Sequence, residues 1–188
     1  MSKDRKHLAC FTLLIACALS VPAARTSRAQ ESPRPSDEIK RITALAGNFD
    51  GAASFTAGGK TTRFTLHHVN RVIAGGFGLA VHESADAPEM GHYEAENLLG
   101  WDAGRKLLHL FSVTSDPNTH DHAGPWRGAT HVTLRYEGLR DGKRMVEVIP
   151  FEIVSPNEYR FRSTITVPGQ APEVFEATMK RIEGLAGR

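Results

Sequence analysis

The hydrophobic pattern of the chain changes at about residue 47. Before it, Ile39, Ile42 and Leu45 recur at helical spacing, and Gly47 can end that helix. After it, apolar and polar residues alternate in segments of about six to ten residues, as in strands with one buried face. We therefore expect one short N-terminal helix followed only by strands.

Turn-forming residues divide the second part into about ten strands. Pairs such as Gly58-Gly59, Gly75-Gly76 and Asp141-Gly142 favour tight turns between antiparallel neighbours. The expected strands are residues 48–56, 60–70, 71–74, 77–84, 92–102, 106–114, 127–137, 143–154, 158–166 and 173–182.

An all-β meander of this length leaves exposed edges unless it closes. We therefore expect a closed, antiparallel, up-and-down barrel, with a β-sandwich as the alternative. An α+β cone of the ketosteroid-isomerase type needs two or three long amphipathic helices, and the chain after residue 30 has room for one.

Two motifs resemble a known family. Residues 45–51 (LAGNFDG) resemble the L-x-G-x-aromatic-x-G opening of lipocalin-like barrels. Residues 71–77 (RVIAGGF), followed by residues 99–102 (LGWD) before a strand at 106–113, are similar in order and spacing to the bacterial domain of unknown function family 1579. The resemblance spans residues 38–182. It implies a calycin-type barrel, usually exported, with no established reaction or substrate.

The first thirty residues are organised like an export signal. Basic residues at positions 3, 5 and 6 precede an apolar run over residues 8–24, and small residues stand at positions 27 and 29. We expect a signal peptide over residues 1–29, an extended tether over 30–36 and one barrel domain over 37–188. The protein would then be periplasmic or secreted, with no transmembrane segment in the mature chain. An uncleaved anchor, or a lipoprotein anchored through Cys17 of the LIAC sequence, is the alternative.

Removal of this segment changes the charge and the cysteine content. The whole chain has 23 basic and 21 acidic residues, and residues 1–29 hold five and one of them, which leaves 18 against 20, a net charge of −2. Cys10 and Cys17 are both lost, so a disulfide, a thiolate nucleophile and cysteine-ligated zinc are excluded from the mature chain. A charge this small also offers no basic stripe for nucleic acid.

The expected cleavage of the signal peptide can be tested directly. N-terminal sequencing of protein recovered from its own host should begin at Gln30, because the charged start, apolar run and small-residue exit occur in that order. Labelled palmitate on the protein, abolished by Cys17→Ser, would instead establish the lipoprotein.

Eight histidines after the signal segment are the most conspicuous candidate chemistry. They are His67, His68, His82, His92, His109, His120, His122 and His131. Strand alternation places His68 on the same face as residues 64 and 66 and predicts that it points inward. The same reasoning points His109 inward with residues 107, 111 and 113, and His131 into solvent.

Residues 119–122 (THDH) place two imidazoles close together. In an extended conformation His120 and His122 fall on one side with Asp121 opposite, and they could hold zinc or copper if a third ligand arrived from elsewhere. Because two ligands do not make a site, we expect no metal and no cofactor, and a solvated polar loop between Pro117 and Pro125.

Established catalytic motifs are absent from the sequence: it has no Gly-x-Ser-x-Gly, phosphate-binding loop or His-Glu-x-x-His. Glu94 and Glu96 alternate against a more apolar face and are expected in solvent. The enzyme alternative would pair His68 or His109 with a carboxylate. Nitrobindin-like haem barrels share the opening motif but hold haem through a histidine near the C-terminal end, whereas the last histidine here is His131. Haem or metal binding is therefore only an alternative.

We expect the protein to bind a small, largely apolar ligand, because a ten-stranded barrel is somewhat wider than its side chains fill. The expected lining residues are Phe64, Leu66, His68, Tyr93, Asn97, Trp101, His109, Phe111, Tyr136, Tyr159 and Phe161. A binding module predicts no convergent titratable groups in the cavity. An enzyme predicts a histidine within hydrogen-bond reach of a carboxylate, and a metal carrier predicts three such ligands around one point.

Overall fold

The structure, a computed structural model, describes residues 34–88, 91–116 and 118–183. It contains one helix, α1 (Asp37–Thr43), a 3-10 turn, η1 (Ala74–Gly76), and the strands β1 (Gly47–Ala57), β2 (Lys60–Ile73), β3 (Gly78–Ala87), β4 (Gly91–Asp102), β5 (Leu107–Thr114), β6 (Thr119–Gly124), β7 (Trp126–Arg127), β8 (His131–Arg140), β9 (Lys143–Ser155), β10 (Glu158–Thr166) and β11 (Glu173–Arg181). The predicted signal peptide lies outside the described residues. Within them, no helix has the length and apolarity to cross a membrane.

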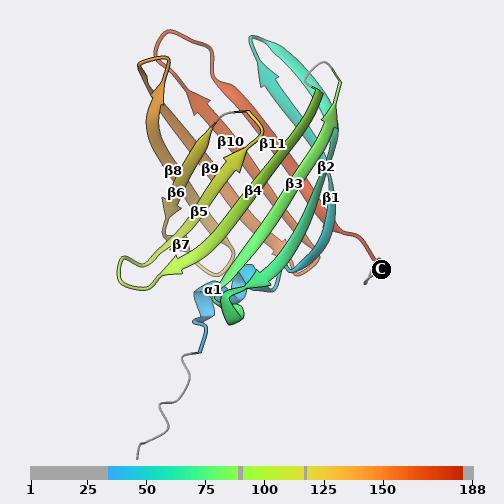
Figure 1. The fold of residues 1–188 in the computed structure, drawn as a ribbon, viewed down its shortest axis with the longest axis vertical. Coiled ribbons are helices and arrows are strands. Elements are labelled where there is room, and N and C mark those ends of the chain that lie inside the picture. The colour runs from blue at the N-terminus through green and yellow to red at the C-terminus, as the bar shows by residue number, and fades with distance from the viewer. Residues whose placement is uncertain (1–33, 89–90, 117, 184–188) are drawn as a thin grey trace, which may run out of the picture. The chain divides into compact units, whose positions relative to one another are not determined.

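The strands form one antiparallel sheet that closes on itself (Figure 1). The order β6-β5-β4-β3-β2-β1-β11-β10-β9-β8 is joined at its ends by a β6–β8 pairing at Ala123 and Arg135. The two-residue β7 pairs with β8 outside this ring. The prediction of a ten-stranded up-and-down barrel is therefore confirmed, and the sandwich alternative is wrong.

One predicted strand and one predicted loop differ from the structure. Residues 71–74 do not form a separate strand, because β2 continues through residue 73 before η1 turns the chain. Residues 119–124, predicted as a loop, form β6. Their inward face carries histidines instead of aliphatic residues, so the usual alternation is missing from the sequence.

Helix α1 closes one end of the barrel (Figure 1). Its apolar face buries Ile39 and Ile42, and Leu45 continues that face just after the helix. Acidic residues Asp37 and Glu38 occupy the first turn, where they favourably face the positive end of the helix dipole. The predicted helix is thus confirmed, and its spacing of apolar residues is explained by this closure.

The motif at residues 45–51 ties the helix to the last strand. Phe49 is fully buried, and the Arg181 guanidinium lies over its ring at 4.6 Å. Arg181 also donates hydrogen bonds to the carbonyls of Ala44 and Ala46, which follow the helix. A β-carbon at Gly47 would overlap this guanidinium. Gly47 also has a φ of 127°, which residues with a side chain rarely adopt, so the backbone requires the glycine, while the aromatic residue supports Arg181.

The apolar core lies mainly in the half of the barrel next to α1. Phe49 and Leu79 stand near the starts of β1 and β3, Leu108 near the start of β5, and Met179 near the end of β11; all are almost completely buried. These strand ends all lie at the end of the barrel that α1 closes, because neighbouring strands run in opposite directions. Side chains therefore fill this half of the interior.

Candidate functional site

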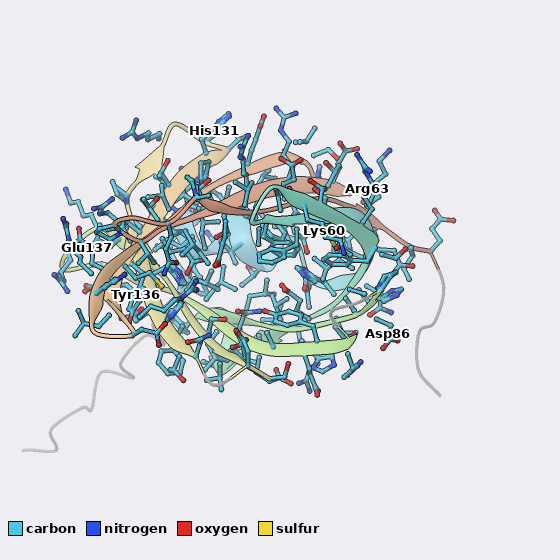
Figure 2. All side chains as sticks on the ribbon, turned by 90° about the horizontal axis from the view of Figure 1, so that it is seen from above. Lys60, Arg63, Asp86, His131, Tyr136 and Glu137 are labelled. Carbon is cyan, nitrogen blue, oxygen red and sulfur yellow. The ribbon has the colours of Figure 1, made fainter. Side chains whose placement is uncertain are left out.

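A cavity of about 560 Å³ occupies the barrel interior. Ile42 of α1 and Leu45, just after the helix, form its floor, and the cavity extends to Asp116, Arg140 and Glu173 near the opposite end. Figure 2 views the barrel from that opposite end. An ion pair of 2.8 Å joins Arg140 to Glu173 at this rim. The cavity therefore runs along the barrel axis from the helix to the loops.

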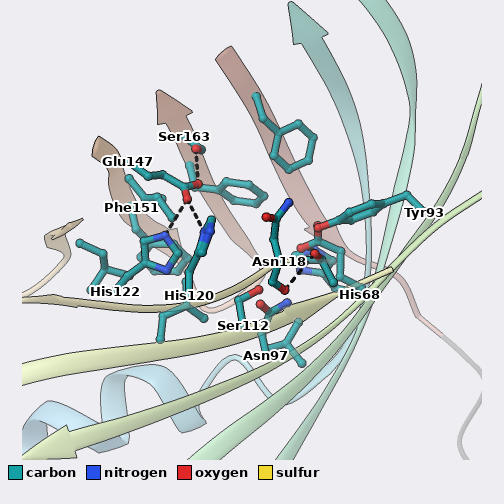
Figure 3. Close-up of a pocket in the computed structure, with 18 of the residues that line it drawn as sticks. His68, Tyr93, Asn97, Ser112, Asn118, His120, His122, Glu147, Phe151 and Ser163 are labelled. Atoms are coloured by element: carbon teal, nitrogen blue, oxygen red, sulfur yellow. Dashed lines mark hydrogen bonds and ion pairs between the residues drawn. The ribbon is translucent and has the colours of Figure 1, made fainter. Parts of the chain in front are cut away.

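Three titratable side chains meet on one wall of the cavity (Figure 3). His120 and His122 project from β6, and Glu147 projects from β9. His120 Nδ1 and His122 Nε2 each lie 2.9 Å from the same carboxylate oxygen, Glu147 Oε2. One oxygen atom thus serves both imidazoles, and we call this group the His-His-Glu cluster.

Neighbouring side chains hold the His-His-Glu cluster in place. Ser163 of β10 donates a hydrogen bond of 2.6 Å to Glu147 Oε1, the other carboxylate oxygen. The Tyr136 ring of β8 stacks on the His120 ring with centroids 4.2 Å apart. Burial on its own would raise the pKa of Glu147, but hydrogen bonds from His120, His122 and Ser163 hold that pKa well below its usual value. The carboxylate is therefore ionised at neutral pH.

A second polar group centres on His68 of β2. Its Nδ1 forms a hydrogen bond of 2.6 Å with the Tyr159 hydroxyl, and its Nε2 lies 2.8 Å from Glu83 Oε2. His68 and Glu83 are both buried and directly opposite each other in the β2–β3 pairing. Asn70 donates to the Leu45 carbonyl nearby. A buried imidazole and a buried carboxylate thus face each other within the cavity wall.

Two tyrosines provide the cavity wall with neutral hydroxyls. Burial, reinforced by the charge of Glu83, raises the pKa of Tyr93 far above its usual value. Burial also raises the pKa of Tyr159, although a hydrogen bond from Asn70 opposes the effect. Both hydroxyls therefore stay protonated at neutral pH and can donate hydrogen bonds.

Six of the eleven predicted lining residues line the cavity: Phe64, His68, Tyr93, Asn97, Tyr159 and Phe161. The other five do not: Leu66, Trp101, His109, Phe111 and Tyr136. Leu66 is fully buried in the core, and Trp101 packs against that core. Tyr136 lies behind His120, whose ring covers it from one side.

The predicted orientation of β5 is wrong. Leu108, Leu110, Ser112 and Thr114 face the cavity, while Phe111 is 41% exposed on the outer surface. His109 is also outside, 3.1 Å from Asp121 of β6. The outward face of β5 is the more apolar one, because it carries Leu107, Phe111 and Val113. The inward face includes Ser112 and Thr114, which a polar cavity accommodates. Apolarity therefore did not identify the inner face.

The remaining polar predictions agree with the structure. His68 points inward, whereas His131, Glu94 and Glu96 lie on the exposed face of their strands. Several exposed histidines stand beside carboxylates on the outside of the barrel, such as His67 beside Asp50 at 2.8 Å. These outer pairs are screened by solvent and contribute little to stability.

Sequence reasoning missed the two buried carboxylates. Glu147 alternates with Met145 and Ile149, and Glu83 alternates with Val81 and Ala85. A carboxylate within the apolar face of a strand is rarely buried without a partner. That interruption of the apolar face was the available signal.

Comparison with known proteins identifies the fold. No family model matches the sequence, and no curated protein matches it. The crystal structure of Rv2717c from M. tuberculosis is similar, with a TM-score of 0.60 and 13% identity over 80% of this chain and 100% of that one. The S-type phycobiliprotein lyase CPES from Guillardia theta has a TM-score of 0.52 and 10% identity over 78% and 92%. This protein therefore has the fold of the calycin-type β-barrels.

Proposed function

We propose that this protein is an exported β-barrel that binds a small, largely apolar molecule in its cavity. The observation that carries the proposal is the cavity of about 560 Å³ that runs from α1 to the opposite loops. Small-molecule sites commonly have about 300–1,000 Å³ and combine apolar walls with a few polar groups. Export rests on the signal-like N-terminal segment, which the sequencing experiment above tests.

Aromatic rings form one wall of the cavity. Phe64 of β2 and Phe175 of β11 stack with centroids 6.0 Å apart, and Phe161 of β10 meets Phe175 edge-on at 5.5 Å. All three line the cavity. Rings held this way offer large apolar area without having to be ordered on binding. They favour a ligand with an aromatic or aliphatic body.

The buried polar groups of the cavity indicate that the ligand also has a polar end. The His68–Glu83 pair and the His-His-Glu cluster both line the same cavity. The sequence predicts no such convergent groups for a binding module. A wholly apolar ligand would exclude water from these groups without offering them any hydrogen bond. We therefore propose an amphipathic ligand whose polar end faces the imidazoles.

The binding proposal predicts the effect of filling the cavity. Ser112→Trp places an indole inside the barrel, because Ser112 faces the cavity from the middle of β5. Affinity for a fluorescent apolar probe such as anilinonaphthalene sulfonate should fall by about tenfold or more. Phe111→Trp is the matched control, since it places an indole on the outer face one residue away, where a phenyl ring already stands, and should leave affinity unchanged. Equal affinity in all three proteins, or none in the wild type, would refute binding in this cavity.

A second candidate function, acid–base catalysis, is favoured by the His68–Glu83 distance of 2.8 Å. A buried histidine beside a carboxylate in a cavity wall is a common arrangement for a general base. To separate the two functions, a molecule that copurifies with the Glu83→Gln variant is incubated with wild type and with Glu83→Gln and then analysed by mass spectrometry. Binding alone returns the molecule unchanged from both. Conversion by the wild type only would establish the enzyme.

A further inference from the structure

We propose that His120, His122 and Glu147 form a binding site for one divalent transition-metal ion of the zinc type. Among the residues that the structure describes, these side chains are the one group of three whose ligand atoms lie within 4.8 Å of one another. The site lies in the wall of the ligand cavity and goes beyond the binding function proposed above.

The geometry is close to that of a metal shell. In a tetrahedral zinc site with bonds of about 2.0–2.1 Å, ligand atoms stand about 3.3 Å apart. Here two of the three separations, from each imidazole nitrogen to Glu147 Oε2, are 2.9 Å. The three ligands would have to spread by only a few tenths of an ångström on those two sides to admit an ion.

The donor atoms select the class of metal. Two imidazole nitrogens and one carboxylate oxygen suit zinc, cobalt, nickel or copper, whereas calcium and magnesium prefer ligand shells made of oxygen alone. Three protein ligands leave a fourth position open, as in catalytic zinc sites. Because all three residues line the cavity, that position faces the cavity interior.

The surroundings supply the support that metal ligands require. Ser163 orients the carboxylate through Oε1 and leaves Oε2 to the imidazoles. Tyr136 fixes the plane of the His120 ring by stacking. Such outer contacts orient ligating side chains and strengthen metal binding.

His122 provides an independent observation. Its side chain is 3% exposed, and its Nδ1 has no hydrogen-bond partner among the described residues. An unpaired buried polar atom is costly. The one hydrogen bond of the ring runs between Nε2 and Glu147, and ring contacts with His120 and Tyr136 hold its plane.

The test measures metal binding directly on tag-free, full-length protein stripped with a chelator. Zinc titration against a chromophoric competitor should give one tight site per chain. Cobalt should produce visible absorption bands of a four- or five-coordinate ion. His120→Ala and His122→Ala should each weaken zinc binding by about a hundredfold or more, because each removes one of three ligands. Glu147→Gln should weaken it as well while preserving side-chain volume.

His109→Ala is the matched control, because His109 lies on the neighbouring strand β5 but faces outward beside Asp121. It should retain full zinc affinity. Circular dichroism and thermal unfolding exclude variants that fail to fold, and His120→Gln replaces His120→Ala if that variant is lost. Absence of a tight site, or zinc binding that survives the His120 and His122 substitutions, would overturn the proposal. Probe binding to the cavity is measured in parallel, so that failure of either proposal is recognised separately.

Discussion

Gly124→Ala should destabilise the protein by about 3 kcal/mol or more, which corresponds to a fall in Tm of about 6–12 °C. Gly124 ends β6 at the β6–β8 pairing that closes the barrel. A β-carbon there would overlap the Thr133 carbonyl oxygen and lie 2.8 Å from its carbonyl carbon. These are backbone atoms of β8, so they cannot rotate away as a side chain would. The β6–β8 pairing must therefore widen to admit the new methyl group.

Chemical denaturation and hydrogen exchange measure this effect. Exchange of the β6 and β8 amides should accelerate more than exchange in β2 and β3, because the substitution strains the β6–β8 pairing. Gly100→Ala in β4 is the matched control, since its β-carbon would meet nothing within 4 Å. It should leave stability unchanged or slightly raised. A Gly124→Ala variant as stable as the wild type would show that the barrel is not closed in this way.

Phe49→Ala should cost about 3–5 kcal/mol of unfolding free energy. The ring is fully buried, lies 4.9 Å from the Tyr159 ring and carries the Arg181 guanidinium on one face. Its removal leaves a void in the half of the barrel that holds the core. It also takes away the ring beneath the arginine that joins the helix end to β11. The loss therefore combines a cavity with a weakened helix attachment.

Equilibrium unfolding in urea provides the measurement, with Phe111→Ala as the control for losing a phenyl ring. Phe111 is 41% exposed on the outer surface, so its removal should cost less than half as much. Comparable losses for both variants would mean that Phe49 is not the centre of the core. Because Phe49 contacts Tyr159, which holds His68, probe affinity should also fall in Phe49→Ala.

Several features follow from short-range patterns in the sequence. The spacing of Ile39 and Ile42 predicts α1, and period-two alternation with glycine turns predicts an antiparallel barrel of ten strands. Alternation alone also places His68 inside and Glu94 and Glu96 outside. These properties depend on neighbouring residues within one element, where backbone geometry dictates which side chains share a face.

The inner face of β5 and the existence of β6 were not predictable in this way. Both depend on how polar the interior is. A cavity that contains buried carboxylates accepts Ser112 from β5 and His122 from β6, so hydrophobicity no longer distinguishes inside from outside. The prediction for β5 rests on an apolar interior, and it therefore placed His109 and Phe111 inside, whereas both lie on the outer surface.

The two polar groups of the cavity differ in what determines them. His68 and Glu83 face each other across adjacent strands, so the register of one hairpin connection accounts for their meeting. His122 and Glu147 lie on β6 and β9, which are not paired with each other and meet only across β8 after the barrel closes. The sequence by itself determined the helix, the strand alternation and the inward histidine, because these are local. Tertiary structure alone decided the His-His-Glu cluster, because the distance between its strands is set by closure of the whole sheet.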